Sequence, residues 1–433
     1  MKRVTGIIAT TVAMAAIVMA GTSAFAVPKA QPFYLKPGDR VVFYGDSITD
    51  QRLYTTYIET FCVSRFPNAH YTFVHSGWGG DRVTGGGGGP VETRIKRDIL
   101  AYKPTVVTIC LGMNDGSYRA FDQNIFNTYV NGYRHIIDTL LKEVPGVRIT
   151  LLTASAYDDV TRAPGFLGGY NATLVTYGEA VRALGKEYGL VVADTNGPLV
   201  AALARAHSAD APLSVQILRD RVHPGPGGHL VMAAALLNAW NAPTTVASVE
   251  INAESAKVAS ASNTRISGLT VKNGALAFTE SDLALPWPFD RDTNRNPDAR
   301  LVLQVTDIET LYNKYLLVVK GLNSPSYKLA IDGKDAGTFT AQQLAAGVDL
   351  AEIDGTPVTA QSQELLAATR KHNDIHFRRW RQVQVTNQSD GLNPSSDVLT
   401  TMTQLDADEA VAVRDQEKLA QPQAHRVTVT PVG

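Results

Sequence analysis

The feature that most constrains the fold of this 433-residue chain is a regular alternation between residues 27 and 242. Short apolar runs with strand character alternate there with longer stretches that have helical patterning. The expected strands lie at 40–44, 71–75, 105–111, 148–154 and 190–193. The expected helices lie at 53–66, 91–100, 125–143, 170–188 and 228–240. Strands that alternate with helices build right-handed βαβ units, so the pattern predicts an α/β fold, a three-layer αβα sandwich around a parallel sheet.

Most of the expected strands end at a polar or glycine-rich loop, at 45–47, 76–80, 112–116 and 156–159. In an open α/β sheet, ligands bind in the crevice at the carboxyl ends of the strands. We therefore expect the functional site at this edge of the sheet. The glycine run at 85–89 does not directly follow a strand and lacks the Gly-Lys-Ser/Thr of a P-loop. It predicts a flexible loop and not a phosphate cradle.

The first of these loops contains Gly45-Asp46-Ser47, where an apolar run stops at a glycine and a polar segment can open a helix. Taken alone, Ser47 is best interpreted as a helix N-cap. A serine in this place acts as a nucleophile only if other residues supply a base, an orienting acid and an oxyanion hole. Asp46 is adjacent to the serine, and we expect its side chain to tie down the turn.

A candidate base and acid occur together in Asp220-Arg221-Val222-His223-Pro224. An Asp three residues before a His lets one loop deliver both groups. Pro224 disfavours helix at His223, and Pro226 can start the next helix, so the pair is expected at a loop–helix junction. Asp194 ends the last expected strand, but it shares no loop with the histidine, and we assign it a structural or rim role.

Two further loops offer donors for an oxyanion hole. Asn114 follows the strongest expected strand and carries side-chain N–H donors. Gly80 lies in the turn after the second strand, where a glycine lets the backbone N–H approach a substrate oxygen. Considered singly, both are ordinary turn residues. Trp78 is expected either to offer a face to a sugar ring or to pack in the core.

Together these segments, over residues 39–240, resemble the GDSL/SGNH hydrolase superfamily. The residues of the four motifs are most similar to those of its secreted bacterial carbohydrate-esterase and lipase/acylhydrolase members. The resemblance implies a flavodoxin-like parallel sheet and no metal or cofactor. It implies Ser47 as the nucleophile, His223 as general base and then acid, and Asp220 as the residue that orients His223. The backbone N–H groups of Ser47 and Gly80, with the Asn114 side chain, would form the oxyanion hole.

The first 26 residues have the pattern of a secretory signal peptide. Lys2 and Arg3 precede a short apolar run, and Ala24-Phe25-Ala26 supplies an A-x-A cleavage site. An uncleaved N-terminal anchor is the alternative, but the apolar run is short for a membrane span. We expect cleavage after Ala26, and therefore a secreted or periplasmic protein with no membrane span.

The overall charge and the cysteines narrow the class of protein further. A net charge of -1 gives no indication of a nucleic-acid partner. Cys62 and Cys110 lie in apolar segments, and we expect two buried free thiols, the alternative in an exported protein being a disulfide between them. The chain has no Cys/His cluster with zinc spacing, which argues against a metal-dependent deacetylase.

Residues 243–386 have a different pattern and are expected to form a smaller α+β accessory region. Its expected elements are strands at 246–251, 276–278, 301–305 and 315–319, a hairpin around Asp332-Gly333, a short helix between a Thr340/Gln343 capping box and Gly347, and a helix at 359–380. Trp287 and Trp380 are expected in the core. Residues 387–433 are expected to be a loosely ordered tail.

These observations favour an exported serine esterase that removes an acetyl or other short acyl group, with a carbohydrate or small-molecule ester as substrate. A lipase, lysophospholipase or thioesterase would use the same residues, but it would need a long apolar groove. A carbohydrate- or surface-binding protein with weak catalysis is the alternative of a different class.

Overall fold

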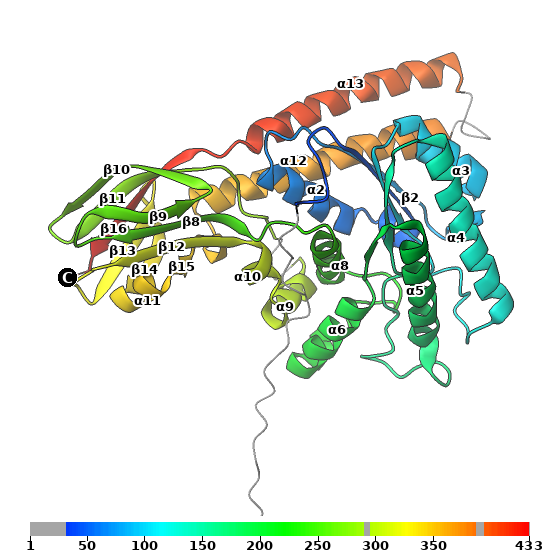
Figure 1. The fold of residues 1–433 in the computed structure, drawn as a ribbon, viewed down its shortest axis with the longest axis horizontal. Helices are drawn as coiled ribbons and strands as arrows, with labels where there is room; N and C mark the ends of the chain where they lie inside the picture. Colours follow the sequence, from blue (N-terminus) through cyan, green and yellow to red (C-terminus); the bar gives the residue numbers. More distant parts are fainter. Residues whose placement is uncertain (1–31, 290–294, 387–393, 433) are drawn as a thin grey trace, which may run out of the picture.

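The computed structural model describes residues 32–289, 295–386 and 394–432 (Figure 1). The expected signal peptide at 1–26 lies outside these residues. Within the described ranges, no helix combines the length and the apolar character that a membrane span requires.

The N-terminal half is built on one parallel sheet. Its strands are β1 (Arg40–Gly45), β2 (Thr72–Gly77), β5 (Val106–Cys110), β6 (Arg148–Leu152) and β7 (Val191–Ala193). They lie in the order β2-β1-β5-β6-β7, and each neighbouring pair is parallel. This is the strand order of flavodoxin-like folds. The predicted α/β class is confirmed, and each of the five expected strands is present with small shifts at its ends.

Helices cover both faces of this sheet. The first face carries α3 (Val91–Asp98), α4 (Gln123–Glu143) and α5 (Gly169–Tyr188), and the second carries α2 (Leu53–Arg65), α6 (Gly197–Ala209) and α8 (Pro226–Ala239). Successive residues of β1 alternate between the two cores, with Val42 packing against the first group and Val41 against the second. The helix α6 was not among the helices predicted from the sequence.

The accessory region contains two further sheets. One has the order β10 (Thr264–Lys272), β11 (Ala275–Asp282), β16 (Ala424–Pro431), β13 (Ser326–Ile331) and β14 (Lys334–Thr340). The other has the order β15 (Val348–Asp349), β12 (Lys314–Lys320), β8 (Thr245–Asn252) and β9 (Lys257–Ser262). The expected hairpin is confirmed: Asp332 and Gly333, with φ of 50° and 78°, join β13 to β14. The capping box at Thr340 and Gln343 is present and opens α11 (Ala341–Ala346).

Two expectations for this region do not hold. Residues 301–305 lie in a helix, α9 (Pro297–Val305), because Pro297 opens a helical turn and Leu301 and Val302 share its buried face. The tail is also more ordered than expected, since it contains α13 (Ser396–Leu419) and β16. Few residues of α13 are buried, so its sequence has only a weak helical pattern. The strand β16 pairs with strands more than 90 residues away, and the N–H of Arg426 donates to the side chain of Asp332, so its pairing has no local signal.

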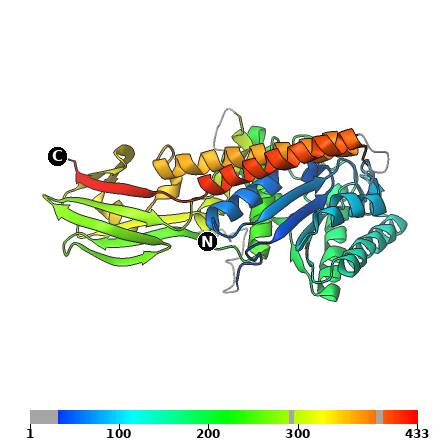
Figure 2. The ribbon, with the colours of Figure 1, turned by 90° about the horizontal axis from the view of Figure 1, so that it is seen from above.

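Two long helices connect the accessory sheets to the α/β region. Both views show α12 (Pro357–Phe377) and α13 side by side, running from the accessory sheets back over the α/β region near α2 (Figures 1 and 2). A π-helical segment, Arg378–Val385, continues α12.

Trp287 and Trp380 are each 1% exposed and Cys62 and Cys110 are buried free thiols, as expected.

Candidate active site

Ser47 lies where β1 ends, and it is the first residue of the short helix α1 (Ser47–Asp50). The N-cap is Asp46, whose Oδ1 accepts a hydrogen bond from the N–H of Ile48 at 3.0 Å. The interpretation of Ser47 as an N-cap is therefore wrong, and the expected role of Asp46 in tying down the turn is confirmed. Burial raises the pKa of Asp46 to about 8. A side chain at Gly45 would place its Cβ 2.6 Å from the carbonyl oxygen of Cys110, so only glycine fits there.

The loop before α8 brings His223 and Asp220 to Ser47. The Nε2 of His223 lies 2.8 Å from the Oγ of Ser47, and its Nδ1 lies 2.6 Å from the Oδ2 of Asp220. The other oxygen of Asp220 accepts the N–H groups of Val222 and His223 at 3.0 and 2.7 Å. Partial burial raises the pKa of Asp220, but these hydrogen bonds outweigh it and hold that pKa below its ordinary value. The carboxylate therefore stays ionised beside the imidazole.

Asp194 lies apart from this chain of hydrogen bonds. Its Oδ1 accepts the N–H groups of Asn196 and Gly197, both at 3.1 Å, and it forms an ion pair with Arg182 at 2.9 Å. It therefore holds the turn that begins α6, in agreement with the structural role expected for it.

Asn114 approaches from the loop after β5, with its side chain oriented from both ends. Its Nδ2 donates to the carbonyl oxygen of Asp81 at 3.0 Å, and its Oδ1 accepts from the hydroxyl of Tyr118 at 2.8 Å. An amide nitrogen carries two protons, and among the described residues Asp81 engages one of them. Sequence reasoning missed Tyr118, which reaches the site only through the left-handed backbone at residues 117 and 118.

Gly80 has a φ of +77°, a left-handed conformation that favours glycine, and it is exposed. The residues before it are fixed to residues 45–51, which we call the nucleophile turn after the role expected of Ser47. The N–H of Trp78 donates to the carbonyl oxygen of Gly45 at 2.9 Å, and the N–H of Gly79 donates to Oδ2 of Asp50 at 3.1 Å. We call residues 78–80 the oxyanion loop, after the role expected of Gly80.

Trp78 is half-buried and packs against neighbouring side chains. The guanidinium carbon of Arg381 lies 3.1 Å from the centre of its ring, and the ring of Trp380 meets it edge-on at 5.8 Å. The glycine run at 85–89 forms a short hairpin of β3 (Gly85–Gly86) and β4 (Gly89–Pro90), which packs against the Trp78 side chain. A Cβ at Gly87 would lie 2.9 Å from the Trp78 Nε1. Of the two roles considered for Trp78, these contacts fit core packing.

A second histidine, His229, was not identified from the sequence. It is buried, its Nδ1 accepts the N–H of Tyr54 at 3.2 Å, and its Nε2 lies 3.0 Å from the side-chain oxygen of Gln51. Burial lowers its pKa to about 3, so it stays neutral. It holds α2 and the end of the nucleophile turn together.

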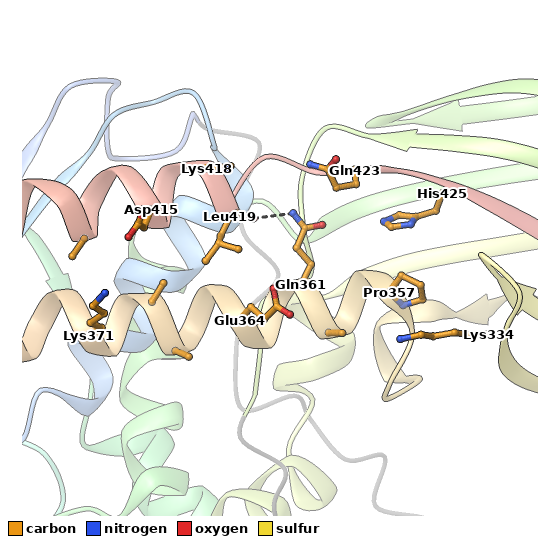
Figure 3. A pocket seen from close by; sticks show the side chains of 14 residues that line it. Lys334, Pro357, Gln361, Glu364, Lys371, Asp415, Lys418, Leu419, Gln423 and His425 are labelled. Atoms are coloured by element: carbon orange, nitrogen blue, oxygen red, sulfur yellow. Dashed lines mark hydrogen bonds between the residues drawn. The ribbon is translucent and has the colours of Figure 1, made fainter.

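Two cavities are relevant to ligand binding. A cavity of about 380 Å³ borders His223, and its lining includes the polar side chains of Gln51, Gln216, Arg219 and Asn296. A larger groove of about 980 Å³ lies between α12 and α13, and no proposed catalytic residue lines it (Figure 3). Among the residues described, no group of His, Cys, Asp or Glu is arranged to hold a metal ion.

Comparison with known proteins gives matches for both parts of the chain. Residues 43–231 match the GDSL-like lipase/acylhydrolase family. An acetylxylan esterase of Geobacillus stearothermophilus is 26% identical over 220 residues, which cover 46% of this chain and 93% of that protein. The solved structure of a gut microbial diltiazem-metabolizing enzyme has a TM-score of 0.81 at 24% identity, and the match covers 94% of this chain and 100% of that one. The accessory region is therefore part of an architecture that recurs in another protein.

Proposed function

Because residues 43–231 belong to the GDSL/SGNH hydrolase superfamily and the chain is a hydrolase of ester bonds, we propose that it is an exported serine esterase acting on carbohydrates. The acyl group removed is acetyl or another short chain. The observation that carries this proposal is the continuous chain of hydrogen bonds from Ser47 through His223 to Asp220, at 2.8 and 2.6 Å.

In the proposed reaction, the Oγ of Ser47 attacks the carbonyl carbon of the ester while His223 takes the hydroxyl proton at Nε2. The tetrahedral intermediate collapses, and His223 gives that proton to the leaving alcohol. Water then attacks the carbonyl carbon of the acyl-enzyme while His223 takes a proton from it. The bond to Ser47 breaks, His223 returns that proton to the Oγ of Ser47, and the carboxylic acid leaves. Asp220 holds the histidine tautomer and stabilises the imidazolium throughout.

The negative charge on the tetrahedral oxygen needs donors that are in place beforehand. The N–H of Ser47 opens α1, so the helix itself offers it no carbonyl partner. We propose this N–H, the N–H of Gly80 and the Nδ2 of Asn114 as the oxyanion hole. Each lies on a turn that is fixed by hydrogen bonds to its neighbours.

Two observations support a carbohydrate as the alcohol. The relative from Geobacillus stearothermophilus is an acetylxylan esterase. The leaving alcohol takes its proton from His223, so the alcohol part of the substrate must bind beside this residue. The cavity of about 380 Å³ next to His223 offers amide and guanidinium groups that suit sugar hydroxyls. The signal-like segment at 1–26 supports export, since polymeric carbohydrates are met outside the cell.

The test is acetate release from acetylated xylo-oligosaccharides and acetylated polysaccharide, with p-nitrophenyl acetate and a long-chain p-nitrophenyl ester for comparison. We expect the short esters to react faster than the long one. Ser47→Ala should lower kcat by about 10⁴-fold or more, because the nucleophile is lost. Ser47→Ala hydrolysing p-nitrophenyl acetate at the wild-type rate would overturn the mechanism. A preference for the long-chain ester would instead favour a lipase.

A further inference from the structure

Two neighbouring side chains of the C-terminal part of the chain, Trp380 and Arg381, contact the oxyanion loop, and Arg381 carries the charge. Arg381 lies in the π-helical segment after α12, more than 300 residues from Trp78 in sequence. Its guanidinium carbon is 3.1 Å from the centre of the Trp78 ring, and its Nη2 is 3.7 Å from Oδ2 of Asp50. That same Oδ2 accepts the N–H of Gly79 at 3.1 Å. Arg381 thus contacts Trp78 directly and is linked to Gly79 through Asp50, and these two residues lead into the proposed oxyanion donor Gly80.

We propose that Arg381 is a positioning residue for the esterase reaction, through which the accessory region fixes the oxyanion loop against the nucleophile turn. The proposal rests on the proposed function, since it assigns Gly80 a role in the reaction. Asp50 ends α1, the helix that Ser47 begins, and Trp78 and Gly79 lead directly into Gly80. A cation between Asp50 and Trp78 therefore sets the distance between the nucleophile and one oxyanion donor.

Arg381 is held in this place by its own neighbours in the π-helical segment and in α12. The preceding Trp380 donates from Nε1 to Oδ1 of Asp98 at 2.6 Å and is 1% exposed. Earlier in α12, the carbonyl oxygen of Asn373 and the carboxylate of Asp374 accept from Nη1 of Arg52 at 3.0 and 2.9 Å. These contacts fix the backbone from which Arg381 extends.

The charge of Arg381 matters because Asp50 is partly buried. Burial raises the pKa of Asp50, and the nearby Arg381 opposes that rise. Without the cation, the carboxylate would be a weaker acceptor for the N–H of Gly79, and the loop would gain freedom. The Trp78 ring would at the same time lose the planar group that covers one of its faces.

The first test compares Arg381→Met with Arg378→Ala, using p-nitrophenyl acetate. Arg378 is an exposed arginine three residues earlier in the same segment and serves as a matched control. Displacement of a catalytic group can cost up to about 10²-fold, and for this indirect contact we expect kcat to fall about tenfold with KM nearly unchanged. Arg381→Lys, which keeps the charge but not the planar group, should recover part of the loss. The melting temperature of each variant separates this effect from unfolding.

A double-mutant cycle with Arg381→Met and Asp50→Asn tests whether Arg381 acts on the oxyanion loop through Asp50. If Arg381 acts through Asp50, the two substitutions together should cost clearly less than the product of their separate effects. Multiplicative effects, or a folded Arg381→Met enzyme with wild-type kcat, would overturn the inference while leaving the proposed esterase standing. A wild-type enzyme that neither hydrolyses p-nitrophenyl acetate nor is labelled at Ser47 by a fluorophosphonate would instead refute the proposed function, and with it this inference.

Discussion

At the scale of single residues, the proposed site depends on how side chains are oriented by neighbours that take no part in the reaction. Asn114 is the clearest case, because its amide is fixed by Asp81 at Nδ2 and by Tyr118 at Oδ1. An amide that lost one partner could rotate and present its oxygen to a developing negative charge. The hydroxyl of Tyr118 therefore contributes to which end of Asn114 faces the substrate.

We expect Tyr118→Phe to lower kcat about threefold to tenfold, which is the rate equivalent of one neutral hydrogen bond of about 1 kcal/mol. Asn114→Ala should lower kcat much more, by about 10²-fold to 10³-fold, because it removes the proposed donor itself. The measurement is kcat on p-nitrophenyl acetate for both variants. A Tyr118→Phe enzyme as fast as wild type, beside a slow Asn114→Ala, would show that Tyr118 does not orient the amide.

At the scale of elements, the helix that follows His223 is capped from outside its own segment. The Oδ2 of Asp298, in α9 of the accessory region, accepts the N–H of Gly227 in the first turn of α8 at 2.7 Å. Asp298 is buried, and a Cβ at Gly225 would lie 2.6 Å from the same oxygen. The carboxylate satisfies a backbone donor at the helix N-terminus, and it does so next to the loop that carries the proposed base.

We expect Asp298→Ala to lower the free energy of unfolding by about 1–2 kcal/mol, because a buried N–H loses its acceptor. Asp298→Asn keeps an oxygen and should cost less. Urea denaturation of the two variants and the wild type measures the difference. Equal midpoints for Asp298→Ala and wild type would show that Asp298 does not act as a cap for α8.

Asp298 also shows where sequence reasoning stops. The helix start at Pro226 was expected from the proline itself, because proline is accommodated in a first turn. Its cap, Asp298, lies 71 residues after Gly227, shortly before residues 301–305, which were expected to form a strand. A contact between distant segments has no local pattern, and a short apolar run such as 301–305 fits either a strand or a helix.

At the scale of the whole molecule, α12 and α13 are fixed to the α/β region by a buried charged cluster. Nδ1 of His372 lies 2.8 Å from Glu59 in α2, and its Nε2 lies 3.1 Å from Glu409 in α13. Glu59 also contacts His75 and Gln416 at 3.0 and 2.8 Å. Burial lowers the pKa of His372, but the charges and hydrogen bonds of Glu59 and Glu409 together outweigh it and raise that pKa to about 10. Burial raises the pKa of Glu59, but its hydrogen-bonded histidines bring it down to about 2.

These shifts predict how stability depends on pH. The pKa of His372 is raised above its ordinary value of 6.5, so its contribution is fully present below pH 6.5 and is lost as the pH rises through about 10. We expect His372→Gln to lower the free energy of unfolding by about 3 kcal/mol near pH 6, because the buried Glu59 loses its cation. The difference from wild type should shrink by pH 10. A difference that stays constant from pH 6 to pH 10 would contradict a charged His372.

The sequence by itself determined the α/β class, the parallel sheet and the edge where the candidate site lies, because strand and helix periodicity and turn residues are local properties. It also identified Ser47, Gly80, Asn114, Asp220 and His223, whose proposed roles follow from short motifs at strand ends. Only the tertiary structure decided that the tail completes a sheet and packs α13 on α12. It alone placed Arg381 beside the site, because packing brings together segments that are far apart along the chain. It also placed Tyr118 against Asn114, through the left-handed backbone at residues 117 and 118.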